Sequence, residues 1–290
     1  MSIFQAIILG VLQGIAEFLP ISSSGHLAVA QRLFGLSDVP LLFDVMLHLA
    51  TLAAVILYFR KKIARLFVIL FRWVIPNGKQ KIENGKLEGE TATPPEVDLL
   101  TGTDELGRKT ILAVIFATVV TGAIGVVTSK LIPEMPIKVT CAGFLFTACL
   151  LIFSARWEKK HDRPLESKGI SIRQSLFIGF MQGVGTLPGV SRSGSTIAGA
   201  QLAGVNRAAA GEFSFIVSIP AILGAFVLEA KDLGEVSSQI GALPVFCGCL
   251  AAFAWGYLSL SILMKLIRKG KLEWFACYLI PLGVAGLILF

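Results

Sequence analysis

Long apolar stretches dominate this sequence and restrict the folds that it can adopt. Six runs are long enough to cross a lipid bilayer, allowing for tilt; they lie at residues 41–59, 110–129, 139–155, 212–228, 242–264 and 274–290. Only 16% of the residues are charged, whereas about 25% is typical of a soluble domain. Because a backbone inside hydrocarbon must satisfy its own hydrogen bonds, these runs predict transmembrane helices and an all-α integral membrane protein.

Two further apolar stretches, residues 1–35 and 174–206, are interrupted near their middles by proline, glycine and serine. Such interruptions leave backbone groups without helical partners, which a membrane protein tolerates only where the segment is buried in protein or lines a cavity. Broken segments of this kind are typical of re-entrant hairpins and of half-helices that end inside the membrane. We therefore expect two re-entrant helical hairpins in addition to the six spans.

The distribution of basic residues indicates how the chain is oriented. Most of the 26 lysines and arginines follow the first, third and fifth spans or lie in the polar insert at residues 76–109. Cytoplasmic loops are enriched in these residues, so we expect the insert and these connections to lie inside and both termini to lie outside. The net charge of +7 then reflects membrane orientation, and the scattered clusters do not indicate nucleic-acid binding.

With this orientation, the two broken segments enter from opposite sides of the membrane, and each is followed by three spans. The sequence supports a repeat independently, because residues 13–35 and 182–204 are identical at seven of 23 positions without gaps. We expect two inverted-topology repeats at residues 1–155 and 156–290, each with a re-entrant helical hairpin and three transmembrane helices. Such repeats bring the broken segments together near the midplane.

The five cysteines all lie in apolar runs, without a CxxC pair or a neighbouring histidine. This pattern is typical of small apolar residues packed in helices, and it supports neither a zinc site nor a disulfide framework. The N-terminal apolar run has no basic segment before it and leads directly into polar residues. We therefore do not expect a cleaved signal peptide.

The first broken segment carries residues suited to catalysis. It reads QGIAEFLPISSSGHL at residues 13–27, with Glu17 before the proline and Ser23 and His26 after it. Ser23 and His26 share a face of one helical turn, so the histidine could take the serine proton or itself attack phosphorus. Glu17 could orient His26, accept a proton or hold a divalent metal ion. An ionisable residue inside the membrane is a functional candidate by default.

The second broken segment contains PGVSRSGST at residues 188–196, which places Arg192 opposite Ser23 when the repeats are superposed. A guanidinium matches phosphate oxygens in a bidentate manner, and small residues at a helix start leave backbone N–H groups free for an anion. Both segments also contribute small or hydroxyl-bearing residues to this predicted anion site: Ser22, Ser24, Gly25, Ser191, Ser193, Gly194 and Thr196. Charge neutralisation, a nucleophile and a proton acceptor are the requirements of phosphoryl transfer.

Some of these polar residues have a structural explanation as well. Asp44 and Glu212 stand near the start of the spans that follow the two motifs, where they could simply cap a helix. A lone membrane histidine such as His48 is more often a packed or hydrogen-bonding residue than a functional one. Serine and glycine also permit close packing of membrane helices, which is the alternative for Ser22, Ser24, Gly25 and Gly194.

The two motifs resemble those of the undecaprenyl-diphosphate phosphatases, the bacterial enzymes associated with bacitracin resistance. The family pattern (E/Q)GxxEFLPxSSxGH corresponds here to QGIAEFLPISSSGH, and PGxSRSGxT corresponds to PGVSRSGST. The resemblance covers nearly the whole chain. It implies a multi-pass enzyme of the bacterial cytoplasmic (inner) membrane that hydrolyses undecaprenyl diphosphate to undecaprenyl phosphate and inorganic phosphate, which recycles the lipid carrier of peptidoglycan.

The resemblance also implies roles for particular residues. Glu17, Ser23, His26 and Arg192 are expected to be catalytic, with the neighbouring serines in the site. The family further implies an outward-opening site, a homodimer and stimulation by a divalent cation, Mg2+ or Ca2+. Glu17 and Asp44 are the candidate ligands of that cation.

One departure and one rival hypothesis accompany this interpretation. Some family members have glutamate at the position of Gln13, and a neutral amide is a poorer ligand for a hard cation than a carboxylate.

The rival hypothesis is an inverted-repeat transporter or flippase for an anionic lipid or a small anion, since broken helices suit such proteins equally well. The combination of glutamate, serine and histidine favours the enzyme, because a binding site alone does not need it.

Overall fold

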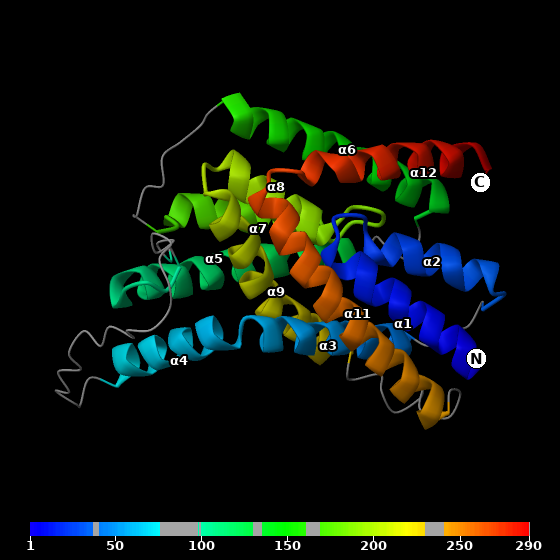
Figure 1. Ribbon diagram of the computed structural model, residues 1–290, viewed down its shortest axis with the longest axis horizontal. Helices are drawn as coiled ribbons and strands as arrows, with labels where there is room; N and C mark the ends of the chain where they lie inside the picture. Colours follow the sequence, from blue (N-terminus) through cyan, green and yellow to red (C-terminus); the bar gives the residue numbers. More distant parts are fainter. Residues whose placement is uncertain are drawn as a thin grey trace.

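The computed structural model describes residues 1–36, 41–75, 98, 100–129, 135–160, 169–229 and 241–289. Within these ranges the regular structure is helical, as expected. The helices are α1 (Ile3–Phe18), α2 (Ser23–Leu33), α3 (Leu41–Tyr58), α4 (Arg60–Val74), α5 (Asp104–Ser129), α6 (Ile137–Lys160), α7 (Ile172–Val184), α8 (Arg192–Leu202), α9 (Arg207–Glu229), α11 (Ala242–Arg268), the 3-10 helix η3 (Leu272–Phe275) and α12 (Ala276–Leu289). Figure 1 shows an elongated helical bundle with both chain termini at the same end.

Five of the described helical segments are long and apolar enough to cross a membrane, namely α5, α6, α9, α11 and the continuous η3–α12 segment. The remaining predicted span corresponds to α3, which bends by 80° into α4 at a break next to Phe59. The apolar run at residues 242–264 is only part of α11, because polar residues continue the helix beyond it. The prediction of an integral membrane protein built from helices is confirmed.

Two segments that the sequence places in polar connections prove to be helical. The basic residues after the first span form α4, whose buried Leu66 and Ile69 join a cluster of apolar side chains with Ile111 of α5. Helix α5 begins at Asp104, inside the expected insert at residues 76–109. Its first turn is polar on the exposed side, with Asp104 and Glu105, whereas Leu106 is buried. Acidic residues in a first turn also stabilise a helix, because their charge interacts favourably with the helix dipole. The earlier part of the insert, residues 76–97, lies outside the described residues.

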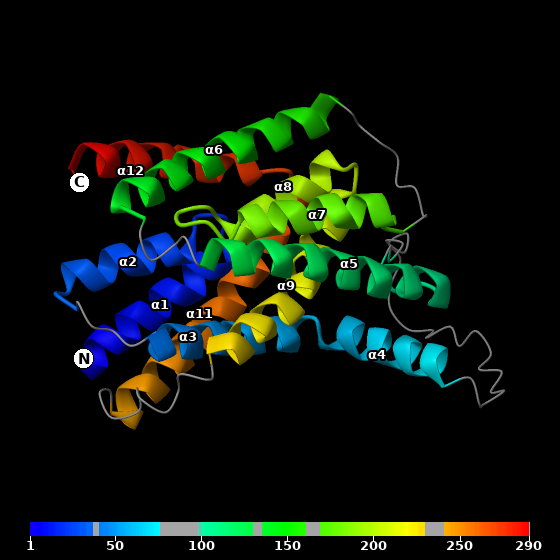
Figure 2. The same cartoon turned by 180° about the vertical axis from the view of Figure 1, so that it is seen from behind.

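The two broken segments form helical hairpins, as the sequence predicts. Helices α1 and α2 flank a turn at residues 19–22, and α7 and α8 flank a turn at residues 185–191. Figures 1 and 2 show the hairpins pointing toward the centre of the molecule from opposite ends of its long axis. Their turns are in contact there, since a Cβ atom on Gly194 would lie 3.0 Å from the Cβ atom of Pro20.

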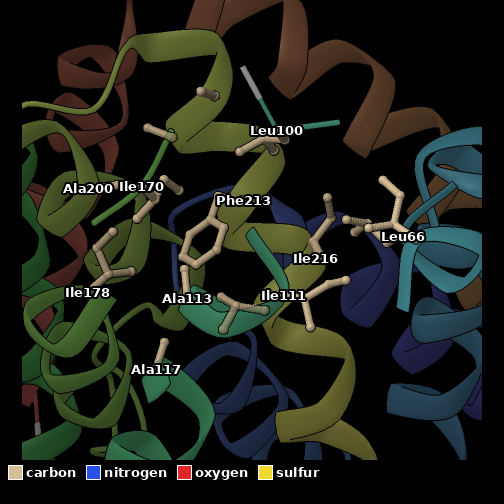
Figure 3. Packing of buried hydrophobic residues seen from close by; sticks show 14 residues of the cluster. Leu66, Leu100, Ile111, Ala113, Ala117, Ile170, Ile178, Ala200, Phe213 and Ile216 are labelled. Atoms are coloured by element: carbon tan, nitrogen blue, oxygen red, sulfur yellow. The ribbon is translucent and has the colours of Figure 1, made fainter. Parts of the chain in front are cut away.

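Buried apolar side chains hold the second hairpin in place. Figure 3 shows the ring of Phe213 of α9 inside a cluster that also contains Ala113 of α5 and Ile178 of α7. Ala200 of α8 belongs to the same cluster and is fully buried. The helices that carry the second turn are therefore anchored on both sides by packed neighbours, which restricts the position of the turn itself.

Glycines allow two pairs of helices to pack very closely. A Cβ atom on Gly10 of α1 would lie 2.2 Å from the carbonyl oxygen of Gly248 of α11. Helix α7 approaches α5 in the same way, since a Cβ atom on Gly179 would lie 2.5 Å from the carbonyl oxygen of Ala117. Small residues are common where membrane helices meet, because they let the two backbones come together.

Replacement of Gly10 with alanine is expected to lower the melting temperature of the purified protein, because the new methyl group meets a backbone oxygen that cannot rotate away. Overpacking of this kind costs about 1–3 kcal/mol. The matched control is Gly122→Ala in α5, where a Cβ atom would meet no described atom within 4 Å and helix propensity improves. Thermal unfolding in detergent, followed by tryptophan fluorescence, compares the two variants. Equal melting temperatures would contradict close contact between α1 and α11.

Candidate active site

The first hairpin turn brings Ser23 toward Glu17. Leu19 has φ −59° and ψ 137°, as expected for a residue that precedes proline, and Pro20 ends α1 at the predicted position. Ser22 then adopts φ 70° and ψ 97°, a conformation that is unfavourable for a residue with a Cβ atom. Because α2 begins directly afterwards, this turn places the Ser23 hydroxyl within reach of the last turn of α1.

The second hairpin turn places Arg192 at the first residue of α8. Gly189 has φ +75°, and a Cβ atom at this position would lie 1.8 Å from the carbonyl oxygen of Thr140, so only glycine fits. Ser191 caps the helix, because its hydroxyl accepts a hydrogen bond from the N–H of Gly194 at 3.1 Å. The turn and the cap together direct the start of α8, and with it Arg192, toward the first hairpin.

The two turns meet at the carboxylate of Glu17. Its Oε1 atom pairs with Nη2 of Arg192. Its Oε2 atom accepts hydrogen bonds from the Ser23 hydroxyl at 2.6 Å and from Nε2 of Gln13 at 3.1 Å, and Nε2 of His48 lies 3.5 Å away. The side chain of Glu17 is 4% exposed. A charge can be buried in this way only when it is paired and hydrogen-bonded, and both conditions are met.

His26 does not pair with Ser23, contrary to the possibility raised by their spacing. Its Nδ1 atom lies 2.8 Å from the carbonyl oxygen of Ser22, and its Nε2 atom lies 2.7 Å from the hydroxyl of Tyr278 in α12. The Ser23 hydroxyl bonds to Glu17 instead. Because both ring nitrogens have other partners, this geometry favours Glu17 rather than His26 as the acceptor of the serine proton.

Three of the predicted substrate-binding residues have clear packing or local roles. A Cβ atom on Gly25 would lie 2.6 Å from the ring of Phe144, and Gly194 packs against Pro20. The hydroxyl of Thr196 donates to a carbonyl oxygen of the preceding helical turn at 2.6 Å. The structural alternative considered for the glycines therefore fits their surroundings, and each keeps two chain segments close together at the site.

The serines of the two motifs present hydroxyl groups on both turns. Ser22 and Ser24 have their hydroxyl oxygens 3.5 Å apart, and those of Ser191 and Ser193 are 3.2 Å apart. Ser24 is exposed, whereas the other three are buried. The hydroxyl of Ser195 is buried and has no hydrogen-bond partner among the described residues. Both hairpin turns thus carry pairs of neighbouring serine hydroxyls, and the hydroxyl of Ser23 bonds to the carboxylate of Glu17.

The residues near the site do not fit a divalent cation held by the protein alone. Asp44 lies in the first turn of α3 and accepts a hydrogen bond from Nε2 of Gln31 at 2.8 Å. Both oxygens of Glu17 already interact with neighbouring side chains. Within the described residues, no group of three or more histidine, cysteine, aspartate or glutamate side chains is arranged to hold a metal ion. The Mg2+ or Ca2+ that the resemblance implies stays a prediction.

Glu212 does not cap its helix, because α9 begins earlier, at Arg207. Its buried carboxylate instead pairs with Nζ of Lys62, and it lies 3.7 Å from Nη2 of Arg268. Lys62 also bonds to Asp98 at 3.1 Å. Glu212 is therefore part of an ion-pair network that joins α4, α9 and α11. The sequence suggested a cap because the apolar run begins at residue 212, whereas the helix itself begins five residues earlier.

Two residues that lie at the site were not assigned to it from the sequence. His48 lies one turn after Asp44, whose carbonyl oxygen is 2.7 Å from Nδ1 of the histidine, and this contact leaves Nε2 facing Glu17. An ionisable side chain in a membrane helix is a functional candidate, so this signal was available. Tyr278 lies in an otherwise apolar helix far along the chain from His26, and no pattern links the two residues.

The fold and the site together define a class of protein. It is a multi-pass helical membrane protein in which two hairpins bring a serine, a carboxylate and a guanidinium together in a partly buried cluster. Such a cluster can bind a phosphate group, supply an oxygen nucleophile and accept a proton, which are the requirements of phosphoryl transfer.

The chain belongs to the family described as "Bacitracin resistance protein BacA", which it matches over residues 6–285. It is 44% identical to the undecaprenyl-diphosphatase of Treponema denticola over 290 residues, covering 100% of this chain and 98% of that protein. It is 36% identical to the undecaprenyl-diphosphatase of Carboxydothermus hydrogenoformans, covering 100% and 98% of the two chains. The corresponding protein of Methanobrevibacter smithii is also 36% identical, with coverage of 100% and 97%. The family resemblance carried by the two motifs is confirmed.

Proposed function

We propose that this protein hydrolyses the phosphoanhydride of undecaprenyl diphosphate and releases undecaprenyl phosphate and inorganic phosphate. The observation that carries this function is the cluster of Ser23, Glu17 and Arg192, in a chain whose full-length relatives are named undecaprenyl-diphosphatases. The reaction recycles the lipid carrier of peptidoglycan synthesis. The polyprenyl diphosphate lipid and the membrane are the partners that it requires.

Among the candidate nucleophiles Ser23, His26 and water, the geometry favours Ser23. Its hydroxyl already donates to Glu17 at 2.6 Å, so attack of Oγ on the terminal phosphorus passes the proton to this carboxylate. The bond between that phosphorus and the bridging oxygen then breaks, and undecaprenyl phosphate leaves. Water hydrolyses the phosphoserine in a second step, which releases inorganic phosphate and restores the serine hydroxyl.

The neighbouring residues can support this reaction by binding the phosphate group and by accepting a proton. Arg192 pairs with Glu17 through Nη2, and its remaining N–H groups can hold phosphate oxygens as negative charge develops. Ser191 and Ser193 stand beside it at the start of α8, where a helix favours an anion. His48 faces Glu17 with Nε2 and can receive the proton that the carboxylate takes from the serine.

The two halves, residues 1–155 and 156–290, are inverted repeats in this proposal. Gly10 and Gly179 are equivalent in the repeat alignment, and each would place a Cβ atom against a backbone carbonyl oxygen of another helix. Their partner helices, α11 and α5, occupy equivalent places in the two halves. The hairpins reach the centre from opposite ends, which also supports this symmetry. Both termini would then lie outside the bacterial cytoplasmic (inner) membrane, with the site opening outward.

Two expectations taken from the family stay predictions. One is the homodimer. The other is stimulation by Mg2+ or Ca2+, and since the side chains of the site do not fit a cation by themselves, no step above uses one. Chelation with EDTA followed by addition of each cation would measure this dependence directly.

The test of the proposed function is phosphate release from a polyprenyl diphosphate by the purified protein in detergent, where transport across a membrane is undefined. We expect release of one inorganic phosphate per lipid by the unaltered chain and loss of this release in Ser23→Ala. If the protein binds the lipid but releases no phosphate, the enzyme proposal is wrong and the transporter or flippase alternative gains support.

A further inference from the structure

Tyr278 connects the last helix of the chain to the first catalytic motif. Its hydroxyl oxygen lies 2.7 Å from Nε2 of His26. The two rings are stacked, with centroids 5.7 Å apart and planes inclined by 19°. The imidazole also contacts the ring of Phe144, at a centroid distance of 5.3 Å and with the planes inclined by 58°. His26 is thus held by aromatic side chains from α6 and α12, which pack against each other at the upper edge of Figure 1.

The partners of His26 determine which of its nitrogens carries the proton. The carbonyl oxygen of Ser22 lies 2.8 Å from Nδ1, and a carbonyl can only accept a hydrogen bond. Nδ1 therefore carries hydrogen, and in the neutral ring Nε2 has the free lone pair. The Tyr278 hydroxyl must then be the donor to Nε2. A directed chain of hydrogen bonds runs from Tyr278 through His26 to the backbone of Ser22.

The end of this chain is the strained residue of the first turn. Ser22 has φ 70°, and no other non-glycine residue among those described has positive φ. A residue in such a conformation persists only when its surroundings hold it there, at a cost of about 1–3 kcal/mol. Its carbonyl oxygen accepts from Nδ1 of His26 and from the backbone N–H of the same residue at 3.3 Å. This carbonyl belongs to the peptide group that links Ser22 to Ser23. Holding the carbonyl in place therefore also fixes the orientation in which the chain enters Ser23.

Helix α2 has few other restraints that would hold the turn. Of its eleven residues, only Gly25 and Leu27 are buried. The bond between His26 and Tyr278 ties this helix to α12, on the side away from α1. Loss of that bond leaves the imidazole with one anchoring hydrogen bond instead of two.

We propose that Tyr278 is a positioning residue, whose hydroxyl holds His26 so that the imidazole clamps the Ser22 carbonyl and keeps Ser23 directed at Glu17. This role rests on the proposed function, because its effect is exerted through the Ser23 nucleophile. Tyr278 itself need not touch the diphosphate. The role also explains why both nitrogens of His26 are engaged rather than directed at the serine or at phosphorus.

The test is Tyr278→Phe, which keeps the stacked ring and removes only the hydroxyl. Loss of one hydrogen bond that orients the nucleophile is expected to lower kcat for phosphate release about tenfold, with KM and melting temperature unchanged. The matched control is Tyr257→Phe in α11, which removes a hydroxyl outside the site and should leave both constants unchanged. A raised KM with unchanged kcat would overturn the proposal, because it would mean that the hydroxyl binds the lipid.

A second variant, at His26, tests whether Tyr278 acts through His26 or independently of it. His26→Asn can still donate to the Ser22 carbonyl but offers no Nε2 acceptor to Tyr278. Adding Tyr278→Phe to His26→Asn should therefore cause no further loss of kcat. Full additivity of the two effects, or an unchanged kcat in Tyr278→Phe alone, would overturn the proposal.

A spectroscopic measurement distinguishes failure of this proposal from failure of the proposed function. The chain has three histidines, and loss of a signal in His26→Asn assigns the resonances of His26 in protein labelled with 15N-histidine. Tyr278→Phe should shift the Nε2 resonance of His26, whether or not the unaltered protein releases phosphate. An unshifted resonance would show that the contact does not exist. A shift in a protein that releases no phosphate would retain the contact but reject the proposed function.

Discussion

Replacement of Arg192 with alanine is expected to lower kcat for phosphate release on the order of 10³-fold or more, the effect typical of an arginine that stabilises phosphoryl transfer. Arg192 is the partly buried cation that pairs with the buried carboxylate of Glu17. Its loss removes the group that neutralises the developing negative charge on phosphate. Steady-state phosphate release in detergent, measured beside binding of the lipid, is the appropriate assay.

Three further variants show whether the loss of activity in Arg192→Ala is specific to this arginine. Arg192→Lys keeps a positive charge but lacks the planar fork, so it should recover little activity. Arg207→Ala removes another partly buried arginine that pairs with a glutamate, Glu158, and is expected to keep its activity. Asp44→Ala should also keep much of its activity, because the Asp44 carboxylate accepts a hydrogen bond from Gln31, a residue outside the two motifs. An Asp44→Ala variant that is folded and as inactive as Arg192→Ala would show that Asp44 belongs to the reaction.

Stability must be measured in parallel, because Arg192→Ala also leaves the Glu17 carboxylate without its cation. Removing one partner of a buried ion pair is destabilising by about 3–5 kcal/mol. The double variant Glu17→Gln, Arg192→Ala removes both charges and should recover part of that stability without recovering activity. Recovery of activity in this double variant would contradict a role of both residues in the reaction.

Replacement of Glu17 with glutamine is expected to lower kcat by about 10²- to 10⁴-fold, the range for loss of a general base. Glutamine keeps the size of the side chain, and its amide oxygen can still accept a hydrogen bond from Ser23. It cannot take the serine proton, so the geometry survives while the proton transfer is lost. The kcat of the variant, compared with its KM, is the measurement, and KM should not rise because the negative charge that is lost repels diphosphate rather than attracting it.

The matched control for Glu17→Gln is Glu212→Gln. Glu212 is also buried and also paired with a basic residue, Lys62, but it lies in the network that joins α4, α9 and α11. Both variants remove the charge of a buried carboxylate that pairs with a basic side chain, although Lys62 keeps its bond to Asp98. Both should therefore lose stability, whereas only Glu17→Gln should lose phosphate release. A Glu17→Gln variant with normal turnover would exclude the carboxylate as proton acceptor.

The apolar runs were sufficient to predict the helices, because a chain in hydrocarbon has few ways to satisfy its backbone. They were insufficient for the helix ends. Helix α5 starts at Asp104 rather than at residue 110, and the basic residues after α3 form α4. In both segments polar residues lie on one side of a helix while residues such as Ile69 are buried on the other. A measure of mean hydropathy cannot distinguish such a helix from a polar loop.

The motifs were sufficient to predict that Glu17 and Arg192 belong to one site, since buried ionisable residues require partners. Local spacing was not sufficient to pair them with the other residues. Ser23 and His26 are three residues apart, yet one bonds to Glu17 and the other to Tyr278. The direction of each side chain depends on partners from other helices, and helical periodicity carries no information about those partners.

The sequence by itself determined the membrane helices, the two breaks in them and the residue types available for chemistry. These properties follow from local composition, because hydrophobicity, proline and glycine act on the chain where they stand. Only the tertiary structure decided that Glu17 accepts a hydrogen bond from Ser23, that His48 faces Glu17 and that Tyr278 lies within hydrogen-bonding distance of His26. The first contact depends on the turn between α1 and α2, and the other two join residues far apart in the chain. The distant contacts form only after helices with glycine faces have packed closely together.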